Sequence, residues 1–254
     1  FNGTGFAEIQ LPYGFKFTSI NNVYLNESRS TGTTNPYFGQ YAASNGMVNK
    51  EHDRSWSYNY QQRINWHQVY GKHDVEVMLG HEYYRAYGYA LYAGKHNQFS
   101  VDNKELAGAV VLDNGSSSMS EYNTESWLSR AMYNYDSRYF GSVSAMRQAS
   151  SRFSKDNWWG TFWSFGAGWN MHKESWFNVD WINELKLKAS YGENGNDGIG
   201  SYMYTKYFKI SNSNNEVSLT PSSLGNPEIS WEKNGKFNIG ADFSLLKNRI
   251  WGSI

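Results

Sequence analysis

The chain has 254 residues and a formal net charge of zero, so its overall charge argues against nucleic acid as a partner. It has no cysteine, which excludes disulfides and thiolate metal sites. Aromatic residues make up 18% of the chain, the mean hydropathy is −0.70, and no stretch approaches the roughly 20 apolar residues of a membrane helix. This average is compatible with the strands of a membrane barrel, because their apolar and polar residues alternate.

About nine strand-like stretches follow one another along the chain, and the connections between them alternate in length. The first strand precedes a tight turn at Pro12-Tyr13-Gly14, and the strand-like stretch "GFKFTSINNVYL" follows that turn. A long polar segment is then expected from Asn26 to Asp53.

The stretch "SWSYNYQQRINW", residues 55–66, alternates between a face rich in aromatic residues and an entirely polar face. Trp56 and Trp66 stand at the two ends of the aromatic face, and Arg63 lies on the polar one. At about 3.3 Å per residue and a tilt of about 45°, this length crosses roughly 23 Å, close to the height of an outer-membrane apolar band. Aromatic rings favour the two membrane interfaces, so the pattern indicates a transmembrane barrel strand.

The next elements repeat this arrangement. A short turn at residues 70–73 leads into "DVEVMLGHEYYRAY", and a long segment is expected from Gly88 to about Glu121. The stretch "YNTESWLSRAMYNY" then reaches the short turn Asp136-Ser137, and "RYFGSVSAMR" leads into a loop of medium length. A further strand, "TFWSFGAGWN", ends at the turn region "MHKESWFNVDWIN".

Two strands with clear alternation complete the chain. The stretch "ELKLKASYGE" places Lys186 and Lys188 on its polar face, and "KFNIGADFSL" places Asp242 there. Between them a long loop is expected, with a short strand at "SYMYTKYFKI", and the last short turn is Lys247-Asn248.

The alternation of short turns and long loops indicates an all-β fold, an antiparallel transmembrane β-barrel segment of about nine or ten strands of a larger barrel, with short periplasmic turns and long extracellular loops. A soluble propeller or sandwich also has many strands, but neither predicts this alternation or polar faces with Arg63, Lys186, Lys188 and Asp242. We therefore expect these four charged side chains to face a wet lumen.

Several aromatic residues fall in the expected outward loops or at their rims. Aromatic faces stack on sugar rings, and they also form the interfacial belt of a barrel or contact a covering protein. The candidates for ligand or lid contact are Tyr37, Tyr41, Tyr92, Trp158 and Trp159. For Trp158 and Trp159, which lie next to a strand start, the interfacial belt is the favoured interpretation.

No catalytic or metal-binding pattern is present in the sequence. The six histidines do not have metal-ligand spacing, and no serine lies in a nucleophile elbow. The stretch "ENGNDG" (193–198) has oxygen ligands near glycines but lacks the acidic spacing of a calcium loop, which favours a tight loop. We expect no enzyme activity, no cofactor and no metal.

Four blocks of the chain resemble the SusC-like TonB-dependent transporters of Bacteroidetes outer membranes. The blocks are "YGKHDVEVMLGHE" (70–82), "YNYDSRYFGSVSAMRQASSRF" (133–153), "INELKLKASYGENGNDGIGSY" (182–202) and "LGNPEISWEKNGKFNIGADFSLLKNRIWGSI" (224–254). They occur in the family's order, whereas residues 1–69 fit by pattern more than by motif. Gln148-Ala149 stand where the family usually has Asp-Gly, so this loop is expected to turn differently.

The resemblance implies a large outer-membrane barrel that is closed by an N-terminal plug and covered by a SusD-like surface lipoprotein. Residues 1–254 are then expected to be a part of the barrel domain, without the plug and the remaining strands. The implied function is nutrient uptake by TonB-dependent import of oligosaccharides, with oligopeptides as the alternative cargo. The implied partners are the lipoprotein, the TonB complex through the plug, the cargo and outer-membrane lipid.

Two readings from other classes remain. One is a soluble, sugar-binding all-β module, and the other is a barrel that acts as an enzyme or as a passive porin. Dependence on detergent distinguishes the membrane protein from the soluble one, and a copurifying lipoprotein distinguishes the lidded transporter from the porin.

Overall fold

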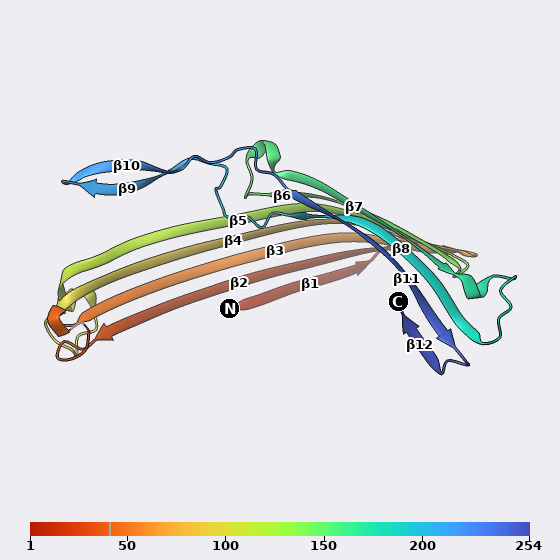
Figure 1. Ribbon diagram of the computed structural model, residues 1–254, viewed down its shortest axis with the longest axis horizontal. Coiled ribbons are helices and arrows are strands. Elements are labelled where there is room, and N and C mark those ends of the chain that lie inside the picture. Colours follow the sequence, from red (N-terminus) through yellow and green to blue (C-terminus); the bar gives the residue numbers. More distant parts are fainter. Residues whose placement is uncertain (41) are drawn as a thin grey trace. The chain divides into compact units, whose positions relative to one another are not determined.

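A computed structural model describes residues 1–40 and 42–254 (Figure 1). The strands are β1 Asn2–Gln10, β2 Phe15–Thr34, β3 Met47–Tyr70, β4 His73–Gln98, β5 Ala109–Tyr135, β6 Tyr139–Ser150, β7 Trp159–Asn170, β8 Ile182–Asn196, β9 Tyr207–Ser213, β10 Glu216–Ser223, β11 Glu232–Leu245 and β12 Ile250–Ser253. Short 3-10 turns are η1 Pro12–Gly14, η2 Ala42–Ser44, η3 Leu106–Gly108, η4 Lys155–Asn157 and η5 Met171–Lys173. Within the described ranges, the protein has no helix long and apolar enough to cross a membrane.

One ten-stranded sheet has the order β1-β2-β3-β4-β5-β6-β7-β8-β11-β12, and β9 and β10 form a separate two-stranded sheet. Neighbours in the sheet are thus neighbours in the chain, except where the β9–β10 hairpin stands between β8 and β11. The pairing is antiparallel from β5 to β8, from β8 to β11 and β12, and within the β9–β10 hairpin. The expectation of an antiparallel all-β fold is confirmed, and the short strand expected near "SYMYTKYFKI" is β9.

The strands are longer than the sequence predicts. The polar segments 26–53 and 88–121 are expected to be long loops, but β2 continues to Thr34, β3 begins at Met47, β4 continues to Gln98 and β5 begins at Ala109. Backbone ladder hydrogen bonds do not require apolar side chains, so pairing continues after the apolar alternation has ended. The connections outside strands shrink to residues 35–46 and 99–108.

The chain divides into two compact units, which we describe separately. One unit consists of residues 1–4, 21–59 and 84–123. Its aromatic residue Trp56 stacks on Tyr58 and on Tyr87, with ring centroids 6.1 and 5.7 Å apart. The aromatic face predicted for this part of β3 is therefore a real side-chain stack.

Ion pairs also connect strands of this first unit. Lys50 Nζ lies 2.8 Å from Glu105 Oε1, and Arg85 Nη2 lies 2.6 Å from Glu121 Oε1. These side chains are partly exposed, so water screens them and each pair contributes little to stability. Both ion pairs lie in the first unit, where the strands extend beyond the lengths that the sequence predicts.

The second unit consists of residues 5–20, 60–83 and 124–254. Its buried aromatic side chains lie where the connection after β6 meets the segment before β11. Phe153 and Phe162 are 1% and 2% exposed, and both rings pack against Trp231 with centroids 5.2 and 5.3 Å away. Two indole N–H groups close the cluster, because Trp231 donates to the Trp158 carbonyl at 2.8 Å and Trp158 donates to the Phe153 carbonyl at 2.7 Å.

The stretch "ENGNDG" continues β8 instead of forming the expected tight loop at once. Gly195 pairs with Lys233 of β11, and the strand ends at Asn196. The Phe162 ring occupies the space in which a Cβ of residue 195 would lie, so the glycine makes room for an aromatic side chain. Asp197 then accepts a hydrogen bond from Ser150 Oγ at 2.6 Å, which ties the strand end to the loop after β6.

Candidate functional site

The strands β5, β6, β7, β8 and β11 carry two chemically different faces. Residues that pair across neighbouring strands form rows over the sheet. One row is Ala131, Val143, Phe165, Tyr191 and Phe237, and a second row is Tyr133, Gly141, Ala167, Ala189 and Ile239. The row between these two is Met132, Ser142, Gly166, Ser190 and Asn238. Successive rows point to opposite sides of a sheet, so the first two rows define an apolar face and the third defines a polar face.

Large apolar side chains on the apolar face are exposed. Phe165 and Phe237 are 50% and 66% exposed, and Trp163 stacks beside Phe165 with centroids 5.9 Å apart. A soluble protein rarely exposes such a continuous apolar surface. In a barrel strand this surface is the one that meets lipid.

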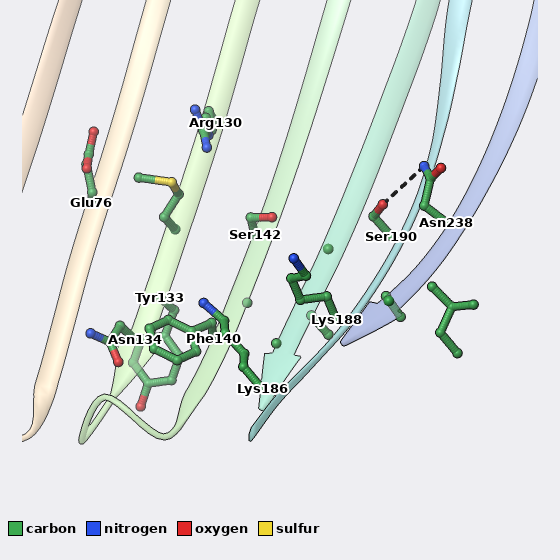
Figure 2. A pocket seen from close by; sticks show the side chains of 18 of the residues that line it. Glu76, Arg130, Tyr133, Asn134, Phe140, Ser142, Lys186, Lys188, Ser190 and Asn238 are labelled. Atoms are coloured by element: carbon green, nitrogen blue, oxygen red, sulfur yellow. Dashed lines mark hydrogen bonds between the residues drawn. The ribbon is translucent and has the colours of Figure 1, made fainter. Parts of the chain in front are cut away.

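The polar face holds a cavity of about 670 Å³ (Figure 2). Charged side chains from β3, β4, β5 and β8 line it, namely His67, Asp74, Glu76, Arg130, Lys186 and Lys188. Figure 2 shows Glu76, Arg130 and Ser142 on successive strands, with Lys186 and Lys188 further along the same face. The wall of this cavity thus carries both positive and negative charges.

Some of these charges are paired and others are free to meet a ligand. His67 Nε2 lies 2.8 Å from Asp74 Oδ1, and Lys188 Nζ lies 2.5 Å from Asp242 Oδ1. Lys186 Nζ lies 4.3 Å from the centre of the Phe140 ring. Glu76 and Arg130 make no ion pair or side-chain hydrogen bond with any other residue of the described ranges.

The structure brings three of the four predicted lumen residues together. Lys186 and Lys188 line the cavity, and Asp242 joins them by accepting from Lys188 and, at 2.7 Å, from Ser253 Oγ. Arg63 does not line this cavity; its Nη2 donates to Gln61 Oε1 at 2.8 Å on the same strand. That these charges face a lumen stays a prediction.

Sequence reasoning did not select Glu76 and Arg130 as site residues. The signal was present, because both occupy polar positions in strands whose alternate residues are apolar. What the alternation did not reveal is that the two strands carrying them are neighbours in the sheet.

The predicted contact residues of the loops lie in different surroundings. Tyr37 is 79% exposed and follows β2, and Tyr92 lies within β4; both belong to the first unit. In the second unit Trp158 is half-buried in the Phe153 cluster, and Trp159 begins β7 with the Arg147 guanidinium 5.1 Å from its ring centre. Tyr41 lies outside the described residues.

An ion cluster connects the turns at the other end of the second unit. Asp136 Oδ2 accepts from Lys72 Nζ at 3.0 Å and from Arg138 Nη2 at 2.6 Å. These hydrogen bonds, that of Lys72 first, lower the pKa of Asp136 below its usual value. The pKa of Glu174 is lowered as well, chiefly because the Tyr139 hydroxyl donates to it at 2.6 Å.

Across residues 1–40 and 42–254, no group of three or more histidine, aspartate or glutamate side chains is arranged to hold an ion. The cavity on the polar face is lined by charged and polar side chains.

Comparison with known proteins finds similar receptors and transporters. No family model matches the chain. The TonB-dependent receptor SusC of Bacteroides thetaiotaomicron is 29% identical over 271 aligned residues, which cover 98% of this chain and 26% of the relative. The TonB-dependent receptor P39 of Formosa agariphila is 29% identical over 213 residues, which cover 81% of this chain and 20% of the relative.

A solved structure of the RagAB peptide transporter superposes with a TM-score of 0.92 at 26% identity, covering 99% of this chain and 28% of that chain. The chain thus spans about a quarter or less of the length of its relatives. The similarity in sequence agrees with the similarity in strand arrangement and with the two-faced register. The chain is therefore similar to the SusC-like TonB-dependent receptors along nearly its whole length, and it is part of an outer-membrane β-barrel.

Proposed function

We propose that this chain forms part of the wall of a TonB-dependent nutrient importer. The observation that carries the proposal is the register, in which apolar and polar rows alternate across β5, β6, β7, β8 and β11. In this proposal the apolar face contacts lipid and the polar face lines the lumen. Arg63, Lys186, Lys188 and Asp242 are the proposed lumen charges.

The complete protein in this proposal contains more than residues 1–254. Further strands close the barrel, an N-terminal plug fills it, and the TonB complex acts through the plug. A SusD-like surface lipoprotein covers the outer mouth. The support for these partners is the similarity to SusC and to one component of RagAB.

The proposed cargo is an oligosaccharide, captured under the lid and released inward when the plug moves. A second candidate is an oligopeptide, which is favoured by two observations. One is the similarity to a structure named a peptide transporter, and the other is the presence of Glu76 and Arg130 in one cavity without partners among the described side chains. A carboxylate and a guanidinium suit the two charged ends of a peptide.

In this proposal the residues bind and guide cargo and catalyse no reaction. The relatives are named receptors and transporters, which supports a role without chemistry. Tyr37 and Tyr92 are proposed contacts of cargo or lid. Trp159 is proposed for the interfacial belt, whereas Trp158 packs within the loop cluster and presents less of its ring to a ligand.

The proposal is tested by purifying the full-length parent from outer membranes in detergent and identifying what accompanies it by mass spectrometry. We expect a stoichiometric surface lipoprotein together with a bound oligosaccharide. A bound peptide selects the second candidate. A protein that dissolves in buffer without detergent, alone, refutes the membrane assignment.

The cargo is tested by uptake in a strain that lacks the parent gene and is complemented with it. Labelled oligosaccharides and labelled oligopeptides are offered in parallel. The variant Arg130→Gln removes the unpaired guanidinium and is expected to lower peptide uptake much more than oligosaccharide uptake. Equal uptake of both by the deletion strain and the complemented strain contradicts the importer.

A further inference from the structure

A second cavity, of about 470 Å³, lies on the opposite side of the sheet in the second unit. Trp127, Arg147 and Thr161 form one row in register, and they point to the same side as Ala131, Val143 and Phe165, which lie four residues away along each strand. This places the cavity on the apolar face. It is a groove open to whatever surrounds the barrel, so cargo in the lumen does not reach it.

The groove has a narrow floor and mainly apolar walls, to which Gln62, Arg63 and His81 also contribute atoms. Ser129 and Ala145, which are partners in the register, are small, whereas Ile64, Leu79 and Trp127 stand around them. Trp127 is 54% exposed although its ring is large and apolar. A depression of this kind in a surface that meets lipid accommodates a hydrocarbon chain.

Arg147 is a charged residue on this mainly apolar face, which also carries Glu125 and His81. Its guanidinium rests over the Trp159 ring and makes no ion pair or hydrogen bond with other described side chains. The carboxylate of Glu125 is engaged elsewhere, because Trp127 Nε1 donates to it at 3.2 Å and His81 Nε2 lies 3.2 Å from it. The positive charge of Arg147 is therefore without a partner carboxylate.

Arg147 lies toward the end of its strand that is remote from the short turn. β6 runs from Tyr139, beside the short turn, to Ser150, and the stretch from Tyr139 to Arg147 spans roughly 26 Å along the strand. A tilt of about 45° converts this length to roughly 19 Å across the membrane. Arg147 thus lies beside Trp127 and Trp159, near the far side of an apolar band of about 25 Å, and its long side chain can extend toward the lipid headgroups.

We propose that this groove binds one phosphorylated lipid of the outer leaflet. An acyl chain lies over Ser129 and Ala145, and the phosphate accepts hydrogen bonds from the Arg147 guanidinium. The planar guanidinium fits two phosphate oxygens at once, and the Trp159 ring holds it in place. The site is independent of the cargo that passes on the other face of the sheet.

The test uses the full-length parent in detergent micelles and native mass spectrometry. The probes are phosphatidic acid, a diacylglycerol with the same chains, and inorganic phosphate. We expect phosphatidic acid to remain bound at lipid-to-protein ratios at which the diacylglycerol and phosphate dissociate. If diacylglycerol is retained as well as phosphatidic acid, the bound lipid belongs to an unspecific shell. If inorganic phosphate is retained as well as phosphatidic acid, the site is a simple anion site. Either result overturns the proposal.

Variants separate the charge from the groove. Arg147→Gln is expected to weaken phosphatidic acid binding about tenfold or more, because a charge-assisted hydrogen-bond pair is lost. Arg130→Gln is the matched control, since this arginine lies on the neighbouring strand and on the polar face, and it should leave lipid binding unchanged (Figure 2). Equal losses in the two variants contradict a specific site.

Filling the groove tests the acyl chain. Ala145→Leu adds bulk on the floor without changing charge and should also weaken phosphatidic acid binding. Arg147→Lys keeps the charge but not the planar fork, and an intermediate affinity is expected. A normal, heat-modifiable barrel band on a gel confirms that each variant is folded, and unchanged affinity in both folded variants refutes the proposal.

Discussion

Replacing Gly195 by alanine places a methyl group in the space of the Phe162 ring. The Cβ of residue 195 would overlap the ring, with two of its carbons at 2.5 Å. The ring has little room to move away, because it is 2% exposed and packs against Trp231 with the centroids 5.3 Å apart. The substitution therefore forces an overpacked cluster.

The magnitude follows from the packing. Overpacking a filled core costs about 1–3 kcal/mol, because side chains leave their rotamers and the backbone shifts. The cluster is local to the loop after β6 and the segment before β11, so the cost is expected in local opening of these segments. At room temperature it corresponds to about a 5- to 150-fold loss of protection from hydrogen exchange.

The assay is hydrogen exchange with mass spectrometry on the full-length parent in detergent. Peptides that cover residues 150–160 and 227–235 should exchange faster in Gly195→Ala, whereas peptides from the short turn at 136–138 should not change. Gly141→Ala is the matched control, because its Cβ would meet nothing within 4 Å. The double variant Gly195→Ala with Phe162→Leu should recover part of the protection.

Two outcomes refute this reasoning. If Gly195→Ala exchanges like the parent, the Phe162 ring is not held in the position described. If Gly141→Ala loses as much protection in the same peptides, the effect comes from the strand propensity of glycine rather than from a clash.

The remaining predictions concern charges and the loop aromatics. Lys72 lowers the pKa of Asp136, so this carboxylate stabilises the fold above the ordinary aspartate range, and the stabilisation is lost as the pH falls through the lowered pKa. Asp136→Asn should therefore lower the melting temperature at about pH 7 but not at about pH 2. A difference in melting temperature that persists in acid contradicts this prediction. Asp242→Asn keeps an acceptor oxygen but removes the negative charge that pairs with Lys188, and it should leave the melting temperature unchanged because both side chains are partly exposed to water. A drop of several degrees would mean that water does not reach the pair. Tyr37→Ala should reduce uptake or lipoprotein copurification without changing the melting temperature, because its side chain is exposed; if both stay at parent levels, Tyr37 is no contact residue.

The sequence predicted the strands in the parts where one face is apolar. In "ELKLKASYGE" and "KFNIGADFSL" the period of two identifies which side chains share a face, so Lys186 and Lys188 were assigned to one side and Leu187 to the other. The same reasoning missed the outer parts of β2 and β5, because polar residues on both faces leave no alternation to detect.

What the tertiary structure decided is which strand positions meet. The period of two says that Arg130 and Glu76 are polar-face residues, but only the strand order places both in the wall of one cavity. Likewise the glycine at 195 is indistinguishable in sequence from a loop glycine, and its role depends on a phenylalanine from β7. Alternation is a local property of the backbone, so the sequence shows which residues share a face of a strand. Register and packing depend on residues far apart in the chain, so the sequence does not show which of these residues meet in one cavity or cluster.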